Sequence, residues 1–250
     1  MKTFLRVEFL KNKRRKFIYP LIIITGLTAL WFYMTMIRVT MSPSTTFKID
    51  QNYLLMNFMI VNGVFIPLFL SVLASQISNI EFENRMWSIL SVNNQSQRQL
   101  LNTKIIYGTF FLFTYWLVEI AVAQLVGHWT HITFDGHLFL ITSVALGLAL
   151  FVIFLFQMIL SFFFKRQSIG LIVGIIGSFI ALMTSGFLPD FVLRWLPIEY
   201  VALASPIKLT NGTQIIINPN FLFNFTLIFI VGIALLVLSQ ILAERRGNRL

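Results

Sequence analysis

Few side chains in this sequence carry groups that could do chemistry. Nine acidic residues and three histidines occur in 250 residues, and there is no cysteine, which excludes disulfides, thiolate metal sites and cysteine nucleophiles. None of the 13 glycines precedes a lysine, so the phosphate-binding loop G-x-x-x-x-G-K-[ST] is absent. The chain therefore has no ATP-hydrolysing P-loop of its own.

Two small clusters of polar residues suggest catalysis or metal binding only superficially. His128, His131 and Asp135 lie close together in sequence, but the spacing is loose and no second-shell partner is evident, so we interpret them as an ordinary hydrated loop. Glu81, Glu83 and Arg85 are similar to the signature of membrane-embedded CAAX-type proteases. That site needs histidines at membrane depth, whereas all three histidines here lie in or beside one loop.

Glu119 is the only acidic residue well inside an apolar stretch. Burying a carboxylate in lipid costs about 3 kcal/mol or more, so we expect it to face a partner or a cavity. One interpretation is a structural hydrogen bond to Asn57, Asn62 or Gln124. The other is a substrate site, in which Glu119 is the counter-charge for a cationic substrate and Asn57 and Asn62 are further contacts.

The composition predicts an all-α membrane protein. The chain is 57% hydrophobic, only 11% charged and has a mean hydropathy of +0.82, whereas soluble domains carry about 25% charged residues. Six stretches reach the roughly 20 residues that a helix needs to cross a bilayer. These stretches are Phe17–Ile37, Tyr53–Ser75, Ile105–Val126, Leu138–Phe164, Ile169–Leu188 and Phe221–Leu242. We expect a single domain over residues 1–250.

The basic residues predict the orientation. With the N-terminus inside, the cytoplasmic segments hold 15 Lys and Arg residues and the outer segments hold four. This asymmetry indicates a multi-pass protein of the bacterial plasma membrane with both termini in the cytoplasm. It also explains the net charge of +10 without a nucleic-acid partner, and the basic segment 1–16 is expected to be an interfacial helix beside anionic lipid.

Two of the connections between spans are long. Gln76–Lys104 is cytoplasmic, keeps a helical apolar period through Met86, Trp87 and Leu90, and then starts a new helix at the capping box Ser96–Gln99. We therefore expect a helix-turn-helix that projects into the cytoplasm. The outer segment Pro189–Asn220 is too short and interrupted to span, and is expected to form short interfacial or re-entrant helices.

The fifth stretch contains the small-residue pattern Gly170-x-x-x-Gly174. Such residues let two helices approach closely. The pattern is compatible with packing inside the bundle and with contact to a second subunit.

These features resemble the permease subunits of ABC-2-type transporters. In that family a Glu after the second span is followed by a small residue and Trp, a Leu-rich stretch, a Pro-x-Ser-Arg segment and a Lys that opens the third span. The corresponding residues here are Glu83, Arg85, Trp87, Ser96, Arg98 and Lys104, although the family's proline and the glycine before its Trp are missing. The resemblance in layout covers the whole chain.

The resemblance implies a transport subunit that is not itself an enzyme. A separate cytoplasmic ATPase would bind ATP and Mg²⁺ and contact Glu83, Arg85, Trp87, Ser96, Arg98 and Lys104, and a second permease chain, identical or different, would complete the transporter. Length and the N-terminal pattern Phe4–Lys11 are most similar to lantibiotic self-protection permeases, which clear cationic antimicrobial peptides from the membrane.

Three alternatives remain open at this stage. They are a non-transporting immunity or binding protein, an ABC-2 exporter of another amphipathic substrate such as a drug or lipid, and a membrane-embedded enzyme. The scarcity of buried ionisable residues disfavours the enzyme.

Overall fold

The computed structural model describes residues 18–41, 50–83, 97–164, 167–184, 189–210 and 214–247. The expected interfacial helix at residues 1–16 lies outside these ranges. The described residues form six long helices, which are α2 (Ile18–Met41), α3 (Gln51–Glu83), α5 (Gln97–Trp129), α6 (Gly136–Phe164), α7 (Gln167–Thr184) and α10 (Phe221–Gly247).

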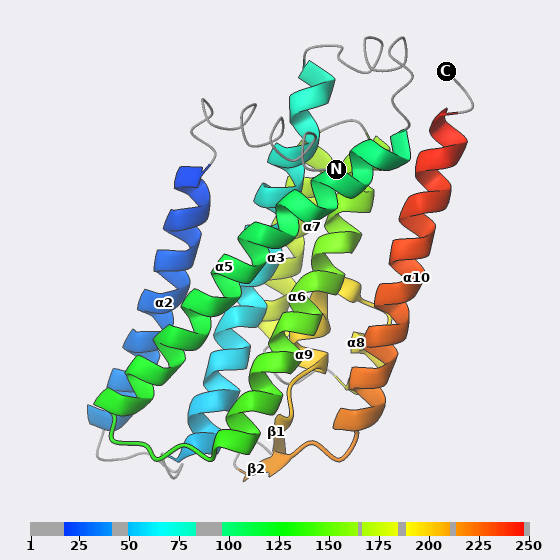
Figure 1. Cartoon of the computed structure of the whole chain (residues 1–250). Coiled ribbons are helices and arrows are strands. Elements are labelled where there is room, and N and C mark those ends of the chain that lie inside the picture. The colour runs from blue at the N-terminus through cyan, green and yellow to red at the C-terminus, as the bar shows by residue number, and fades with distance from the viewer. Residues whose placement is uncertain are drawn as a thin grey trace.

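Five of these helices are long and apolar enough to cross a membrane, namely α2, α3, α5, α6 and α10. Their apolar composition comes from Leu, Ile, Val and Phe, which find their best solvent in lipid. The remaining helix, α7, is equally apolar but has only 18 residues, so the expected count of six spans is not confirmed. Helix α2 begins and α10 ends at the same end of the bundle (Figure 1).

Helix α3 is the centre of the bundle. It is the most buried of the five candidate spans, and it packs against α2, α5, α6 and α7. Helices α2 and α10 lie at the margins and bury the smallest share of their surface. The core is formed by large apolar side chains such as Phe58, Leu70 and Phe154.

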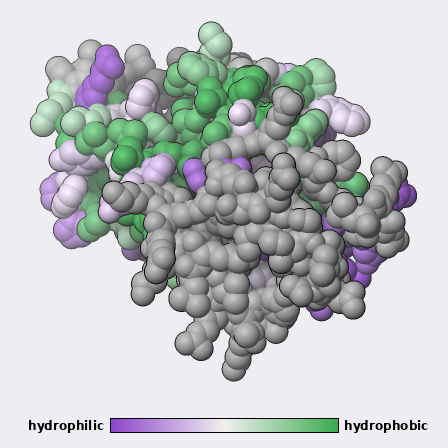
Figure 2. Space-filling view, turned by 90° about the horizontal axis from the view of Figure 1, so that it is seen from above, coloured by the Kyte–Doolittle hydropathy of each residue, from purple (hydrophilic) through white to green (hydrophobic). Residues whose placement is uncertain are grey.

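The outward faces of α2, α5 and α10 carry large apolar side chains. Trp31 on α2, Phe113 on α5 and Phe229 on α10 are each about half exposed. Seen from the end where α10 finishes, hydrophobic residues cover much of the described surface in view (Figure 2). Extended apolar surfaces mark contact with membrane or protein.

The segment between α7 and α10 is not purely helical, which corrects the all-α expectation. It contains the short helices α8 (Asp190–Leu193) and α9 (Tyr200–Leu203), the 3-10 turn η1 (Pro197–Glu199), and an antiparallel hairpin of β1 (Ile207–Thr210) and β2 (Gln214–Ile217). The strands are rich in β-branched residues, which favour pleated backbone. The sequence between them contains Asn211-Gly212, a pair that is a common hairpin signal.

The helical part of this segment packs into the bundle, whereas the β1–β2 hairpin lies at the end opposite the end of α10 (Figure 1). Helix α9 contacts α3, α6 and α10, and it lies within the height of the bundle in Figure 1. Tyr200, Val201 and Leu203 are fully buried there. A re-entrant or interfacial position relative to the membrane stays a prediction.

Candidate coupling and substrate sites

The ends of α3 and α5 flank the connection in which the ATPase contacts were expected. Each helix has 33 residues, about 50 Å at 1.5 Å per residue, whereas the hydrocarbon core is about 30 Å thick. At the end where α10 finishes, α3 projects beyond its neighbours, whereas α5 crosses the bundle obliquely, so tilt takes up part of its length (Figure 1). Helix α3 is therefore long enough to continue beyond the membrane on that side.

Several of the expected contacts lie outside the described residues. Arg85, Trp87 and Ser96 fall in the range 84–96, and of Glu83 only the backbone is described, as the last residue of α3. Helix α5 begins at Gln97, directly after the expected cap Ser96. The role of these residues in binding an ATPase stays a prediction.

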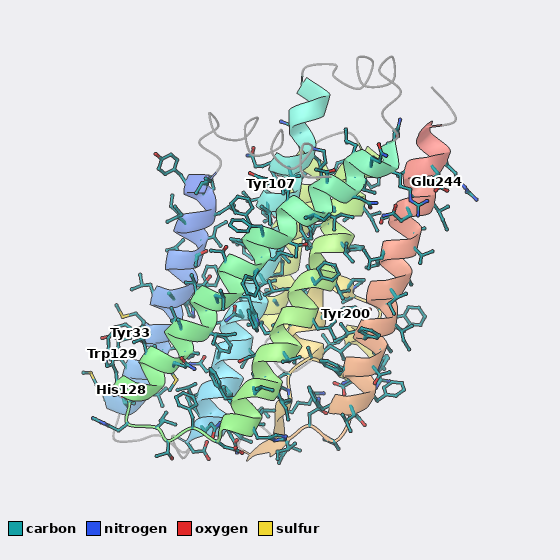
Figure 3. The ribbon with its side chains drawn as sticks, in the orientation of Figure 1. Tyr33, Tyr107, His128, Trp129, Tyr200 and Glu244 are labelled. Carbon is teal, nitrogen blue, oxygen red and sulfur yellow. The ribbon has the colours of Figure 1, made fainter. Side chains whose placement is uncertain are left out.

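Arg98 contacts α10. Its Nη1 donates to Glu244 Oε1 at 2.7 Å in an exposed ion pair, and its Nε donates to Gln240 Oε1 at 2.9 Å. One turn further along α5, Asn102 Oδ1 accepts from Gln240 Nε2 at 2.5 Å. We call Arg98, Asn102, Gln240 and Glu244 the α5–α10 clasp. Figure 3 shows Glu244 at this end of the bundle.

The clasp was not anticipated from the sequence. Arg98 and Asn102 are four residues apart, as are Gln240 and Glu244, so each pair shares one face of its helix. This spacing places two polar pairs on two helix faces, but nothing in it specifies that the faces meet. The clasp gives Arg98 a partner within the chain.

Lys104 lies inside the bundle. Its side chain is 1% exposed and its Nζ donates to the carbonyl oxygen of Ile77 on α3 at 2.5 Å. A buried ammonium needs such partners, because its charge is costly away from water. Direct contact with an ATPase is therefore not available to Lys104 in this packing, and any part it has in coupling is through the joint between α5 and α3.

Glu119 is part of a buried polar cluster. Its side chain is fully buried on α5, and Tyr115, one turn earlier, donates to Asn62 Oδ1 on α3 at 3.2 Å. The Asn62 amide lies beside the Glu119 carboxyl and donates to the Phe58 carbonyl at 3.1 Å. Neither carboxyl oxygen of Glu119 has a hydrogen bond of ordinary geometry among the described residues. Glu119 is thus closely surrounded by neighbouring side chains, but its carboxyl lacks a hydrogen bond of ordinary geometry within the part of the chain that the structure describes.

Only one of the two asparagines expected near Glu119 lies there. Asn57 donates to Thr35 Oγ1 at 2.8 Å and thereby joins α3 to α2. Gln124, the third expected partner, is exposed. Asn57 and Asn62 are five residues apart, which turns their side chains to different faces of α3.

Gly170 and Gly174 pack within the chain. A Cβ atom at Gly174 would lie 2.2 Å from Ser71 and 2.8 Å from the Pro67 carbonyl of α3, and one at Gly170 would lie 2.6 Å from Ser161 of α6. Only residues without a side chain permit this approach. Of the two interpretations of Gly170-x-x-x-Gly174, the structure therefore shows close contact within the bundle.

Two acidic residues lie between α7 and α10, outside the long apolar helices. Asp190 accepts hydrogen bonds from Lys208, from Asn224 at 3.1 Å and from Asn220 at 3.4 Å. Burial alone would raise its pKa, but these donors outweigh burial and hold the pKa below its ordinary value. Glu199 is buried in η1, and burial raises its pKa to about 7. Neither residue was singled out from the sequence.

The chain was compared with known proteins at three levels. Searches of the curated proteins and of the solved structures found no match. The family model described as "ABC-2 family transporter protein" matches residues 4–181, which include α2, α3, α5, α6 and most of α7. The match covers well over half of the 250 residues, and the chain therefore belongs to the ABC-2 family of membrane transporter proteins.

Proposed function

We propose that this chain is the permease subunit of an ATP-driven exporter that clears cationic antimicrobial peptides, of the lantibiotic class, from the bacterial plasma membrane. The absence of a P-loop requires a separate ABC ATPase as the source of energy. The observation that carries the proposal is the length of α3, which exceeds the bilayer core and projects at the end where α5 begins (Figure 1). Family membership supports the transport role.

The two long helices act as levers in this proposal. A push by the ATPase on the connection 84–96 would move α3 and α5 about the joint formed by the Lys104–Ile77 hydrogen bond, so that their far ends separate. The α5–α10 clasp would carry the same movement to α10. Packed helices change between discrete arrangements, so a small displacement at one end is transmitted along the bundle.

The burial of the Glu119 carboxyl supports a cationic substrate as the transported species. Its carboxyl is fully buried between α5 and α3, without an ordinary hydrogen bond among the described residues, and such a group is costly unless it has a function. When α5 tilts away from α3, the carboxyl would meet a substrate cation. In the packing described here the substrate has no access, which fits a closed state of the transport cycle.

Copurification of the ATPase tests the proposal. The permease is coexpressed with a candidate ABC ATPase, and Trp87→Ala and Glu83→Lys are expected to reduce both copurification and peptide-stimulated ATP hydrolysis. Large aromatic residues often dominate interface energies, so Trp87 is the most sensitive position. The matched control is Trp195→Ala, since Trp195 is 84% exposed on the segment between α7 and α10. The proposal fails if no ATPase copurifies with the wild-type chain.

A further inference from the structure

A groove opens on the surface where α2 lies against α3. It is lined by Leu27, Leu30, Trp31 and Met34 of α2 and by Phe65 of α3, with Arg38 at one end. The rings of Trp31 and Phe65 meet edge to face, with their centroids 5.9 Å apart. The four α2 side chains are each about half exposed, so the groove is open to whatever surrounds the bundle.

The groove is about as long, measured along α2, as the hydrocarbon layer of one leaflet is thick. Leu27 and Arg38 are separated by 11 residues of continuous helix, about 16 Å at 1.5 Å per residue. Half of the hydrocarbon core is about 15 Å thick. Because α2 ends at Met41, Arg38 is close to the end of the helix that the charge distribution assigns to the outer surface. The apolar part then lies at the depth of outer-leaflet acyl chains.

The charge at the mouth of the groove selects its occupant. Arg38 is exposed. Among the described residues it has no hydrogen-bond or ion-pair partner. A guanidinium presents a planar fork of donors that matches phosphate oxygens. Within the described part of the chain no carboxylate lines the groove, so a cationic peptide would meet repulsion from Arg38 there. A second copy placed symmetrically on this face would bring two Arg38 side chains together.

We infer that this groove binds an outer-leaflet phospholipid, with an acyl chain along α2 and its phosphate on Arg38. Trp31 and Phe65 supply the apolar wall against which the acyl chain packs. Aromatic side chains bury a large apolar area in such a contact. The bound lipid covers an apolar face of α2 that the bundle itself leaves open. This site is separate from Glu119 and does not depend on the substrate proposed above.

Photolabelling of the full chain tests the inference. The protein is placed in nanodiscs containing phosphatidylglycerol with a photoactivatable diazirine on one acyl chain, and the adducts are mapped by mass spectrometry. Adducts are expected to concentrate on Leu27, Leu30, Met34 and Phe65. Arg38→Gln should lower their yield by about threefold or more, because it removes the charge-assisted bond to phosphate, whereas Arg38→Lys should keep most of it.

Two controls make the result decisive. The first control is Arg245→Gln, which changes an exposed arginine near the C-terminal end of α10 and should leave the groove adducts unchanged. The second control is the labelling of Phe229 and Ile233, which represent an ordinary lipid-facing surface. The inference is overturned if the groove is labelled no more than these α10 positions, or if Arg38→Gln labels like the wild type. Cross-linking of the groove to a second protein chain in place of lipid would also overturn it.

Discussion

At the scale of single residues, Glu119 is the clearest candidate for a functional group. It combines full burial, a position within a candidate span and the lack of an ordinary hydrogen bond among the described residues. A purely structural carboxyl would be expected to have strong donors, because an unsatisfied polar group costs about 1–3 kcal/mol. Of the three expected partners, only Asn62 lies beside the carboxyl, so the structural and the substrate interpretations of Glu119 both stay predictions.

Replacement of Glu119 separates the two interpretations. Glu119→Gln keeps the size and removes the charge, so resistance to a cationic lantibiotic should fall by about tenfold, equivalent to ~1.4 kcal/mol of lost interaction. The melting temperature in detergent should stay equal or rise, since an unpartnered acid is removed. Resistance is measured as the minimal inhibitory concentration in cells that also express the ATPase.

Gln157 provides a matched control for this variant. It is fully buried in α6, and its side-chain atoms likewise have no hydrogen bond among the described residues. Gln157→Leu should leave resistance unchanged. Equal loss in both variants would mean that buried polarity in general, and not the Glu119 charge, is required.

Glu199 and Asp190 should respond to pH in opposite ways. The pKa of Glu199 is about 7 in the folded chain and about 4.3 for an unperturbed Glu, so the folded state binds its proton more tightly. Stability should therefore fall as pH rises through this window and level off above about pH 7. Glu199→Gln should remove this slope in melting temperatures measured from pH 5 to 8.

Asp190→Asn is the contrasting variant. The lowered pKa of Asp190 keeps the carboxylate charged throughout this range, and its stabilising contribution is lost only as pH falls through that pKa. Asp190→Asn should thus lower the melting temperature at every pH from 5 to 8 while the pH slope is retained. A wild-type slope that persists in Glu199→Gln would show that another group causes it.

At the scale of elements, the contact between α3 and α7 depends on a glycine. In Gly174→Ala the added Cβ would lie 2.8 Å from the backbone carbonyl of Pro67, which cannot rotate away, so α7 must shift. Overpacking of this kind costs about 1–3 kcal/mol. We expect a lower melting temperature and less monodisperse protein in size-exclusion chromatography.

Gly26 on α2 is the matching control position. Nothing lies within 4 Å of a Cβ built there, and Ala is favoured over Gly in helices by up to about 1 kcal/mol. Gly26→Ala should therefore be neutral or slightly stabilising. If both substitutions behave alike, helix propensity and not the α3–α7 contact determines the effect.

The α5–α10 clasp gives a charge-swap experiment. Because Arg98 and Glu244 are each 55% exposed, their pair should contribute only about 0–1 kcal/mol to stability. If the clasp transmits movement, Arg98→Glu and Glu244→Arg should each reduce peptide-stimulated ATP hydrolysis, and the double swap should restore it. Failure of the double swap to restore hydrolysis would mean that Arg98 contacts the ATPase directly, as the family resemblance implies.

At the scale of the whole molecule, the arrangement of the helix ends agrees with termini on one side. Helix α2 begins and α10 ends at the same end of the bundle, where α3 also ends and α5 begins (Figure 1). Tyr33, His128 and Trp129 lie at the opposite end (Figure 3), where the Tyr33 and Trp129 rings meet edge to face with centroids 5.5 Å apart. Aromatic residues of this kind are typical of a membrane interface.

Labelling of single cysteines in intact cells tests which end is cytoplasmic. The chain has no native cysteine, so Ser96→Cys and Thr213→Cys each introduce a single reactive thiol. An impermeant maleimide should label Thr213→Cys in intact cells and Ser96→Cys only after lysis, because the positive-inside rule places the segment around Ser96 in the cytoplasm. The reverse pattern would invert the topology and remove Ser96 from the ATPase side.

The sequence by itself determined the class of protein and the position of its apolar helices. Runs of about 20 apolar residues demand lipid and a helical backbone in any packing, and five of the six expected stretches lie in helices long enough to span. The family resemblance, based on the Glu83–Lys104 region and the layout, agrees with the family match over residues 4–181. These properties are local, so the residues of a single segment are enough to predict them.

Only the tertiary structure decided which residues meet. The burial of Lys104 against Ile77, the pairing of Arg98 with Glu244 and the insertion of α9 between α3, α6 and α10 join segments far apart in the sequence. Such pairings depend on the rotation and tilt of each helix, which small residues such as Gly174 set through close packing. Helical periodicity gives the face on which a residue lies, but the neighbour that covers this face is a property of the assembled bundle.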